Sequence, residues 1–261
     1  MSAEGEARQP SGRIAATAAQ AWPPLAVLLA LVAGWELYVE LSGISPVTLP
    51  APSRVLDGAI ATRDILLDNA IVTLKEALIG ITVSIVLGIA FALLIDAFEP
   101  ARRALYPLLV GSQTVPIIVI APLLVLWFGF ELTPKIVVVT LYTFFPITVA
   151  FASGLTAADH DALLLMRTLG ANRLQTLRLL QVPQALPYLF TGLRISVTYA
   201  VVGAVFAEWS GARQGLGIYI LLMKNSFRTD LVFAAIFLIA LLSLALFAVV
   251  VLLEKRLVRW R

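Results

Sequence analysis

Side chains that could perform chemistry are few in this chain of 261 residues. It contains no cysteine and one histidine, His160, so its own residues cannot build a cysteine–histidine zinc site, an iron–sulfur cluster or a disulfide framework. Ser153 lies near His160, but Phe151 stands where a Gly-x-Ser-Gly nucleophile motif needs glycine. The phosphate-binding loop G-x-x-x-x-G-K-[ST] is also absent. We therefore expect no catalytic residue, no metal and no cofactor.

The densest basic segment, residues 166–187, has a pattern typical of two helices joined by a turn. Residues 159–169 favour a helix, Gly170 breaks it, and Asn172 is a good N-cap for a second helix that we expect Pro183 to end. Leucines recur along this second helix at helical spacing and give it one apolar face. Such an element could dock a partner or lie on anionic lipid, and periodicity alone leaves both open.

The polar residues of one apolar run indicate a route through a membrane. Pro107, Pro116 and Pro122 interrupt the run, and Gln113 and Thr114 lie at its middle. Each internal proline removes a backbone hydrogen bond and kinks a helix, which is tolerable where neighbouring groups or water satisfy the freed carbonyls. We interpret the run as a pathway helix with Gln113, Thr114 and Pro116 as candidate lining residues. The alternative is that prolines are simply frequent in membrane helices.

Glu208 and Trp209 are the other pathway candidates, at the outer end of a later apolar run. An acid beside an apolar run could line the outer mouth of a pathway. The alternative, which the position at the edge of the run favours, is an interfacial acid beside a tryptophan anchor.

The composition places these residues in a membrane protein. Hydrophobic residues make up 60% and charged residues 13% of the chain, whereas soluble domains carry about 25% charged residues. Apolar runs of the length of a bilayer crossing predict an all-α protein with six membrane-spanning helices. The predicted spans are Pro23–Leu41, Ala70–Ile95, Leu105–Phe128, Ile136–Leu155, Tyr188–Ala207 and Leu231–Leu253.

Basic residues set the expected orientation. Eleven lysines and arginines fall on the side of the N-terminus and six on the other, which predicts cytoplasmic N- and C-termini. Because these charges lie at the ends of apolar runs, we expect a lipid bilayer rather than nucleic acid as their partner. The predicted organisation is a disordered cytoplasmic tail over residues 1–22, a transmembrane domain over residues 23–255 and a short cytoplasmic tail over residues 256–261.

Small residues recur every four positions in the second span, at Gly80, Ser84 and Gly88. This spacing suits close approach of another helix. The partner helix could belong to a second subunit or to the same chain.

The basic segment resembles the cytoplasmic signature of ATP-binding-cassette (ABC) importer permeases. That signature reads Glu-Ala-Ala, three residues, Gly, nine residues, Ile, any residue, Leu, Pro. Gly170 stands at the glycine, Leu180 and Val182 at the two apolar positions, and Pro183 at the proline, while Leu164–Met166 replaces Glu-Ala-Ala. Four further stretches resemble the nitrate, sulfonate and taurine permease group: LPAPSRV (49–55), VPIIVIAPLLVLWFGFELTPKI (115–136), ALPYLFTGLR (185–194) and AEWSGARQGLG (207–217). Three others resemble the branch of permeases for thiamine pyrimidine precursors or riboflavin: LLMRTLG (164–170), GAVFAEW (203–209) and KNSFRTD (224–230).

The resemblance implies a type I ABC importer permease fold in the bacterial inner membrane, working by alternating access. It implies that residues 159–185 form the loop seated on a separate ATPase subunit. The implied coupling residues are Arg167, Gly170, Ala171, Asn172, Arg173 and Pro183. It also implies two ATPase subunits, an extracytoplasmic substrate-binding protein and a second permease copy, giving a homodimer.

The solute implied is a small vitamin-precursor-like heteroaromatic compound, with a sulfonate- or nitrate-like anion as the other possibility. The alternative function is a six-span channel or an ion-coupled secondary transporter that needs no ATPase. Such a carrier needs buried, paired ionisable groups, and the predicted span centres are nearly free of charge.

Overall fold

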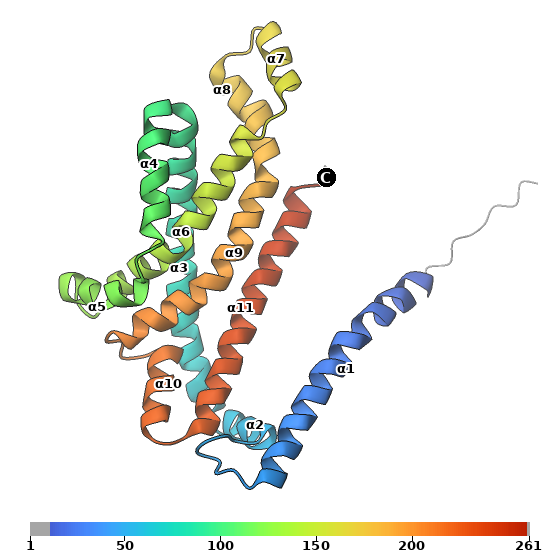
Figure 1. The fold of residues 1–261 in the computed structure, drawn as a ribbon, viewed down its shortest axis with the longest axis vertical. Coiled ribbons are helices and arrows are strands. Elements are labelled where there is room, and N and C mark those ends of the chain that lie inside the picture. The colour runs from blue at the N-terminus through green and yellow to red at the C-terminus, as the bar shows by residue number, and fades with distance from the viewer. Residues whose placement is uncertain (1–10, 260–261) are drawn as a thin grey trace, which may run out of the picture.

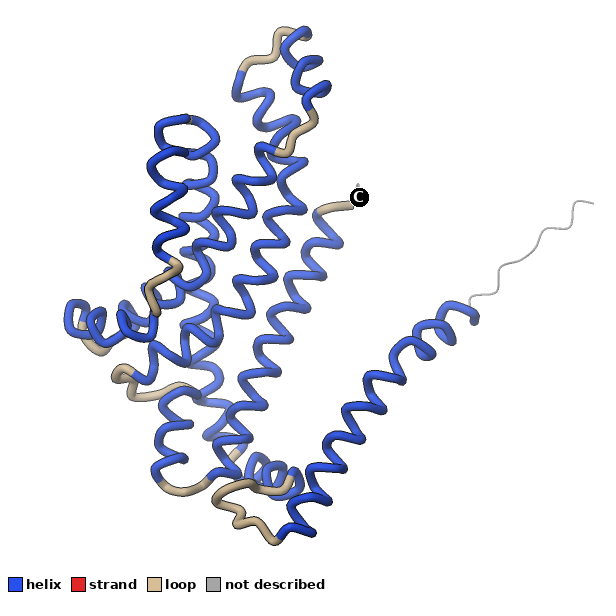
Figure 2. The backbone as a smooth tube through the Cα atoms, viewed as in Figure 1, coloured by secondary structure: helices blue, strands red, loops and turns tan. Residues whose placement is uncertain are grey.

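The computed structural model describes residues 11–259, with side chains described from Trp22 onward (Figures 1 and 2). The elements are α1 (Ser11–Ser42), α2 (Pro52–Ala61), α3 (Arg63–Ala97), α4 (Glu99–Ser112), α5 (Ile117–Phe128), α6 (Leu132–Thr156), α7 (His160–Thr168), α8 (Arg173–Thr176), the π-helix η1 (Leu177–Gln181), α9 (Val182–Trp209), α10 (Leu216–Asn225) and α11 (Thr229–Leu257). No strand occurs in the described part of the chain, which confirms the all-α prediction.

Five helical stretches are long and apolar enough to cross a membrane. They are Trp22–Ser42 within α1, α3, α6, the stretch Arg173–Trp209 that ends with α9, and α11. Each contains one of the predicted spans. A sixth crossing arises only if α4 and α5 are counted together, because the two are bent by 99° at the break between them.

The prediction of one kinked helix over Leu105–Phe128 is wrong in that respect. The helix stops at Ser112 and a new helix, α5, begins at Ile117. Pro116 has an extended backbone, with φ −64° and ψ 113°, and has no N–H to continue the hydrogen-bond ladder. The residue before a proline is also driven away from the helical region. Proline therefore breaks this span, where sequence reasoning allowed only for a kink.

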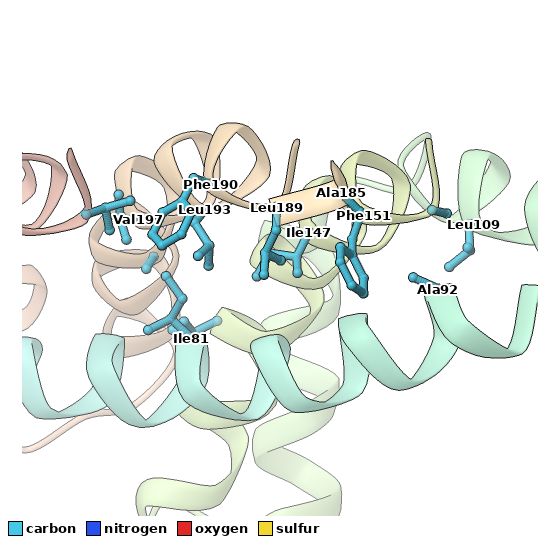
Figure 3. Close-up of a cluster of buried hydrophobic side chains, with 14 of the residues drawn as sticks. Ile81, Ala92, Leu109, Ile147, Phe151, Ala185, Leu189, Phe190, Leu193 and Val197 are labelled. Atoms are coloured by element: carbon cyan, nitrogen blue, oxygen red, sulfur yellow. The ribbon is translucent and has the colours of Figure 1, made fainter. Parts of the chain in front are cut away.

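The main core lies between α3, α6 and α9, with a contribution from α4. Figure 3 shows side chains from these four helices meeting in one apolar cluster, with Ile147 and Phe151 of α6 at its middle. Ile147 and Ala185 have no exposed surface. In a soluble protein, burial of apolar surface stabilises the core by roughly 25 cal/mol per Å² removed from water. Between helices in lipid, close packing of the side chains provides the stabilisation instead.

The small residues of α3 form a seam against α6 within the chain. A Cβ atom built on Gly80 would lie 2.5 Å from Val139 Cβ, and one on Gly88 would lie 2.8 Å from a side-chain atom of α6. Between them, Ser84 Oγ lies 2.5 Å from Thr143 Oγ1. The four-residue repeat is therefore an internal helix contact, which decides between the two alternatives left by the sequence.

Replacing Gly80 with valine is expected to destabilise the protein, because the added methyl groups force α3 and α6 apart. Overpacking of this kind costs about 1–3 kcal/mol. The midpoint of thermal unfolding of the purified protein should fall. Gly111→Val is the matched control, because Gly111 is also helical but nothing lies within 4 Å of its position. Equal midpoints for the two variants would contradict the seam.

Pro183 does not end the second helix of the basic segment, contrary to prediction. The chain stays helical from Arg173 through α8, η1 and α9 to Trp209. The wider π turn of η1 precedes Pro183, which lies in the first turn of α9, where a missing N–H is tolerated. The loop and the following span are thus one continuous rod.

Helix α1 leans away from the other helices in Figure 1 and meets them near its C-terminal end. There the Trp35 ring packs on Phe233 and Phe237 of α11, with ring centroids 5.4 and 6.2 Å apart. The predicted tail over residues 1–22 differs from the structure, because α1 begins at Ser11 in an alanine-rich segment of high helix propensity. Residues 1–10 lie outside the described range.

Candidate functional site

The predicted helix–turn–helix projects beyond the other helices at one end of the molecule (Figure 1). Asn172 caps α8 through a reciprocal pair of hydrogen bonds. The Gln175 N–H donates to Asn172 Oδ1 at 2.9 Å, and the Asn172 N–H donates to Gln175 Oε1 at 2.8 Å. Asp159 caps α7 by accepting from the Asp161 N–H. The predicted N-cap at Asn172 is confirmed, and the turn has a defined shape.

Gly170 gives the turn its backbone direction. Its φ of +74° lies in the left-handed region, which residues other than Gly, Asn and Asp rarely adopt. The Gly170 N–H donates to Arg167 O at 3.0 Å and the Ala171 N–H donates to Met166 O at 2.9 Å. This pair of bonds is a Schellman motif, which closes α7 and turns the chain toward α8.

Arg173 connects the turn to the end of α3. Its Nη2 donates to the carbonyl oxygens of Asp96 at 3.0 Å and of Ala97 at 2.8 Å, the last residues of α3. A guanidinium at a helix C-terminus satisfies free carbonyls and complements the helix dipole. Arg173 and Arg167 line a cavity of about 490 Å³ together with Asp96 and Ala171. Arg173 is therefore bound within the chain and holds the turn against α3.

The turn and its helices expose an apolar surface, which we call the leucine surface. It consists of Leu164, Leu165, Leu169, Leu174 and Leu179, which are 47–73% exposed. Two of these residues stand where the permease signature has Glu-Ala-Ala. Leu177 and Leu180, by contrast, are half-buried, and Pro183 is half-buried in α9. An exposed group of large apolar side chains at the end of a domain indicates a contact with another protein.

A second candidate site is the cavity at the break between α4 and α5, which we call the break cavity. It has a volume of about 250 Å³. Its lining residues are Gln113, Val115, Pro116, Ile117, Tyr142 and Tyr199. Two of the predicted pathway residues, Gln113 and Pro116, therefore share one cavity. Thr114 lies beside them, with its Oγ1 donating to Gly111 O at 2.7 Å.

Tyr142 of α6 and Tyr199 of α9 were missed by sequence reasoning. Their ring centroids are 5.7 Å apart and their planes are inclined by 56°. Each is a hydroxyl-bearing ring inside an apolar span, and that signal could have drawn attention to them. Their meeting could not be read from the sequence, because it depends on how α6 packs on α9.

Glu208 is not among the residues that line the break cavity, and it has no exposed surface. Its Oε1 accepts from Thr73 Oγ1 at 2.6 Å, and its Oε2 accepts from the Gly217 N–H at 2.5 Å. Thr73 Oγ1 in turn accepts from the Leu216 N–H at 2.9 Å. The interpretation of Glu208 as an interfacial acid is wrong, because its carboxyl group fastens the turn before α10 to α3.

Glycine is required in that turn. Gly215 has φ +127°, and a Cβ atom on it would overlap the Glu208 carboxyl group. The Gly215 N–H donates to Asn69 Oδ1 of α3 at 2.8 Å. Trp209 supports the same turn, because its Nε1 donates to Gly217 O at 3.0 Å. Trp209, which the sequence predicts as an interfacial anchor, is 38% exposed, and this hydrogen bond ties it to its own chain.

Glu76 of α3 is a buried acid that sequence reasoning missed. It is 3% exposed, and its carboxyl group lies against that of Glu208. Lys135 is also buried, and its Nζ donates to the carbonyl oxygens of Phe130 and Glu131 at 2.7 and 2.8 Å. Glu76 Oε2 is buried without a hydrogen-bond partner in the described part of the chain, whereas both Glu208 oxygens accept hydrogen bonds. A buried charge without partners is costly, so we expect Glu76 to be the neutral acid of the two.

The three residues of this cluster lie near the end of a predicted span or just outside one, whereas the expectation concerned the span centres. The sequence feature that could have indicated a buried acid is Glu76, because it lies inside the predicted span Ala70–Ile95. Its partner is 132 positions further along the sequence, so pattern alone could not pair them.

Comparison with known proteins gives consistent matches. A family described as "Binding-protein-dependent transport system inner membrane component" matches residues 80–259. The formylaminopyrimidine transport permease protein ThiX of Halalkalibacterium halodurans is 41% identical over 243 residues, covering 93% of this chain and 97% of that protein. The riboflavin transport system permease protein RibX of Chloroflexus aurantiacus is 35% identical, covering 92% and 91%. A crystal structure of an amino acid ABC transporter with histidines matches with a TM-score of 0.62 and 17% identity, covering 76% of this chain and 97% of that one.

Proposed function

Because the chain belongs to the family of binding-protein-dependent transport system inner membrane components, we propose that it is the permease subunit of an ATP-driven importer of a small solute. It spans the membrane, has the fold of ABC transporter permeases and is a transport subunit rather than an enzyme. In this family a separate ATPase subunit supplies the energy, which agrees with the absence of a phosphate-binding loop in this chain.

The observation that carries the proposal is the leucine surface at the tip of the α7–α8 turn. It offers apolar side chains to a partner at the end of the molecule, on a turn whose shape is fixed by Gly170 and Asn172. Arg167 and Arg178 are exposed beside it and complement acidic residues of an ATPase. Charges at such a rim tune orientation and association rate more than affinity.

The proposed mechanism is alternating access driven through this turn. The ATPase subunits move the turn when they close on ATP, and the rod Arg173–Trp209 carries that displacement across the membrane. Arg173 transfers part of it to α3. At the far end, Glu208 couples α9 to the turn before α10. The spans then expose the pathway to one side and the other alternately.

The proposed assembly contains two permease copies, two ATPase subunits and an extracytoplasmic binding protein. A second copy is supported by α5, which begins at the break cavity and whose Leu126 and Trp127 are 79% and 70% exposed. One chain thus supplies one wall of a pathway, and its copy supplies the other.

The proposed location is the bacterial inner membrane with both termini in the cytoplasm. The charge pattern supports this orientation, because the start of α4 and the α7–α8 turn lie toward one end of the molecule (Figure 1), and both segments carry arginines. In this orientation α2 and α10 face outward, where a binding protein delivers the solute.

Affinity purification of the tagged chain from its native membranes tests the function. We expect an ATPase subunit to co-purify in stoichiometric amounts, and solute uptake to stop when that subunit is deleted. Uptake that continues at the full rate without any ATPase would instead establish the ion-coupled carrier. The Glu76–Glu208 pair has the composition that such a carrier needs, but Glu208 is bound to Thr73 and to backbone, which supports a structural role.

A further inference from the structure

We propose that the break cavity is a transit site for an uncharged, planar, single-ring heteroaromatic solute, recognised by Tyr142, Tyr199 and Gln113. The inference rests on the proposed transport function and names the solute class and the residues that select it. Three observations carry it: the ring geometry, the size of the cavity and the absence of charge.

The two tyrosine rings form a corner. With centroids 5.7 Å apart and planes inclined by 56°, they touch each other and leave no slot between them. A planar solute ring therefore stacks on the face of one tyrosine and meets the edge of the other, which are the two favourable aromatic arrangements. Tyr199 is 45% exposed, so its face is open to such a ring.

The size of the cavity favours one ring. Its volume of about 250 Å³ is below the range of roughly 300–1,000 Å³ that is usual for sites of larger organic ligands. A substituted pyrimidine fits this space better than the three fused rings of a flavin.

The lining excludes the anionic alternative. None of the six lining residues is lysine or arginine. A sulfonate or nitrate removed from water needs charge-assisted or multiple N–H hydrogen bonds, and leaving a charge unpaired is costly. Gln113 instead offers one amide that both donates and accepts, which matches ring nitrogens and exocyclic amino groups.

The site is also placed to respond to the ATPase. Tyr199 lies on α9, in the same helical rod that begins at the α7–α8 turn, whereas Tyr142 lies on α6. A displacement of the rod shifts one ring relative to the other. The corner therefore changes shape in step with the transport cycle.

Chromosomal variants in the native host test the site with its natural partners present. The probes are labelled formylaminopyrimidine, riboflavin and taurine, and uptake is measured as the difference from a strain that lacks the chain. We expect uptake of formylaminopyrimidine only, lowered about tenfold by Tyr199→Ala and by Tyr142→Ala, because each removes a stacking surface. Tyr199→Phe should keep most of the uptake, since it keeps the ring.

The matched control is Tyr188→Ala, because Tyr188 is also on α9 and is 44% exposed but does not line the cavity. Immunoblots of the membrane fraction check the amount of each variant. Undiminished uptake in both cavity variants, or an equal loss in Tyr188→Ala, would overturn the site. Dependence of taurine or riboflavin uptake on the chain, or of none of the three, would overturn the solute class. Co-purification of an ATPase decides the proposed function separately.

Discussion

Replacing Gly170 with valine is expected to release the ATPase subunit while the membrane helices stay folded. The φ of +74° at this position costs a residue with a side chain about 1–2 kcal/mol, and a β-branched one more. A Cβ atom at this position would meet nothing within 4 Å beyond its chain neighbours, so the effect comes from the backbone. Relief of the strain is expected to reorient α7 against α8 and so to break up the leucine surface.

A misplaced docking surface should weaken ATPase binding by at least about tenfold, since every 1.4 kcal/mol corresponds to that factor. The measurements are retention of the ATPase on the purified permease, and solute uptake by the same cells. Two controls separate docking from strain. Gly170→Asn should retain both ATPase binding and solute uptake, because asparagine tolerates positive φ. Gly43→Val carries the same strain at φ +65° in the turn after α1, also with open space around it, and should retain the ATPase. Full retention in Gly170→Val would refute docking at this turn.

The second large effect is an asymmetry between two buried glutamates. Glu208→Gln is expected to destabilise the protein by about 1–3 kcal/mol, whereas Glu76→Gln should change stability little. A glutamine at position 208 has one acceptor oxygen for two donors, Thr73 Oγ1 and the Gly217 N–H, and so leaves one of them facing an amide NH₂. A glutamine at position 76 is neutral, has nearly the shape of a protonated carboxyl group and leaves the hydrogen bonds of Glu208 intact.

Thermal unfolding of the purified variants measures this difference, and Glu208→Ala should lower the midpoint furthest because it leaves both donors unpaired. The outcome depends on which acid carries the proton. If Glu76→Gln lowers the midpoint more than Glu208→Gln does, Glu208 is the neutral acid and Glu76 the charged one. Equal damage would show that the two positions are not distinguished by their partners.

Features that depend on neighbouring residues could be predicted from the sequence. The N-cap at Asn172 and the break at Gly170 follow from residue type and from contacts within a few positions. The long apolar spans follow from the thickness of the bilayer. Pro183 shows the limit of local reasoning, because the π turn before it let the helix continue where proline normally ends one.

Features that depend on packing between distant segments could not be predicted. Thr73 and Glu208 are 135 positions apart, yet their side chains are joined by a hydrogen bond of 2.6 Å. Tyr142 and Tyr199 meet only because α6 packs along α9. For Glu208 the sequence predicted a polar residue at the edge of a span, and only the fold shows that the side chain is fully buried.

Arg173 and Glu208 join α3 to the two ends of the rod Arg173–Trp209. The arginine binds the carbonyl groups of Asp96 and Ala97 at one end, and the glutamate binds Thr73 at the other. Two helices joined at both ends resist sliding along each other and so move as a pair. The movement that transport demands must therefore come from other contacts, such as the one between α9 and α6 and the joint where α4 meets α5.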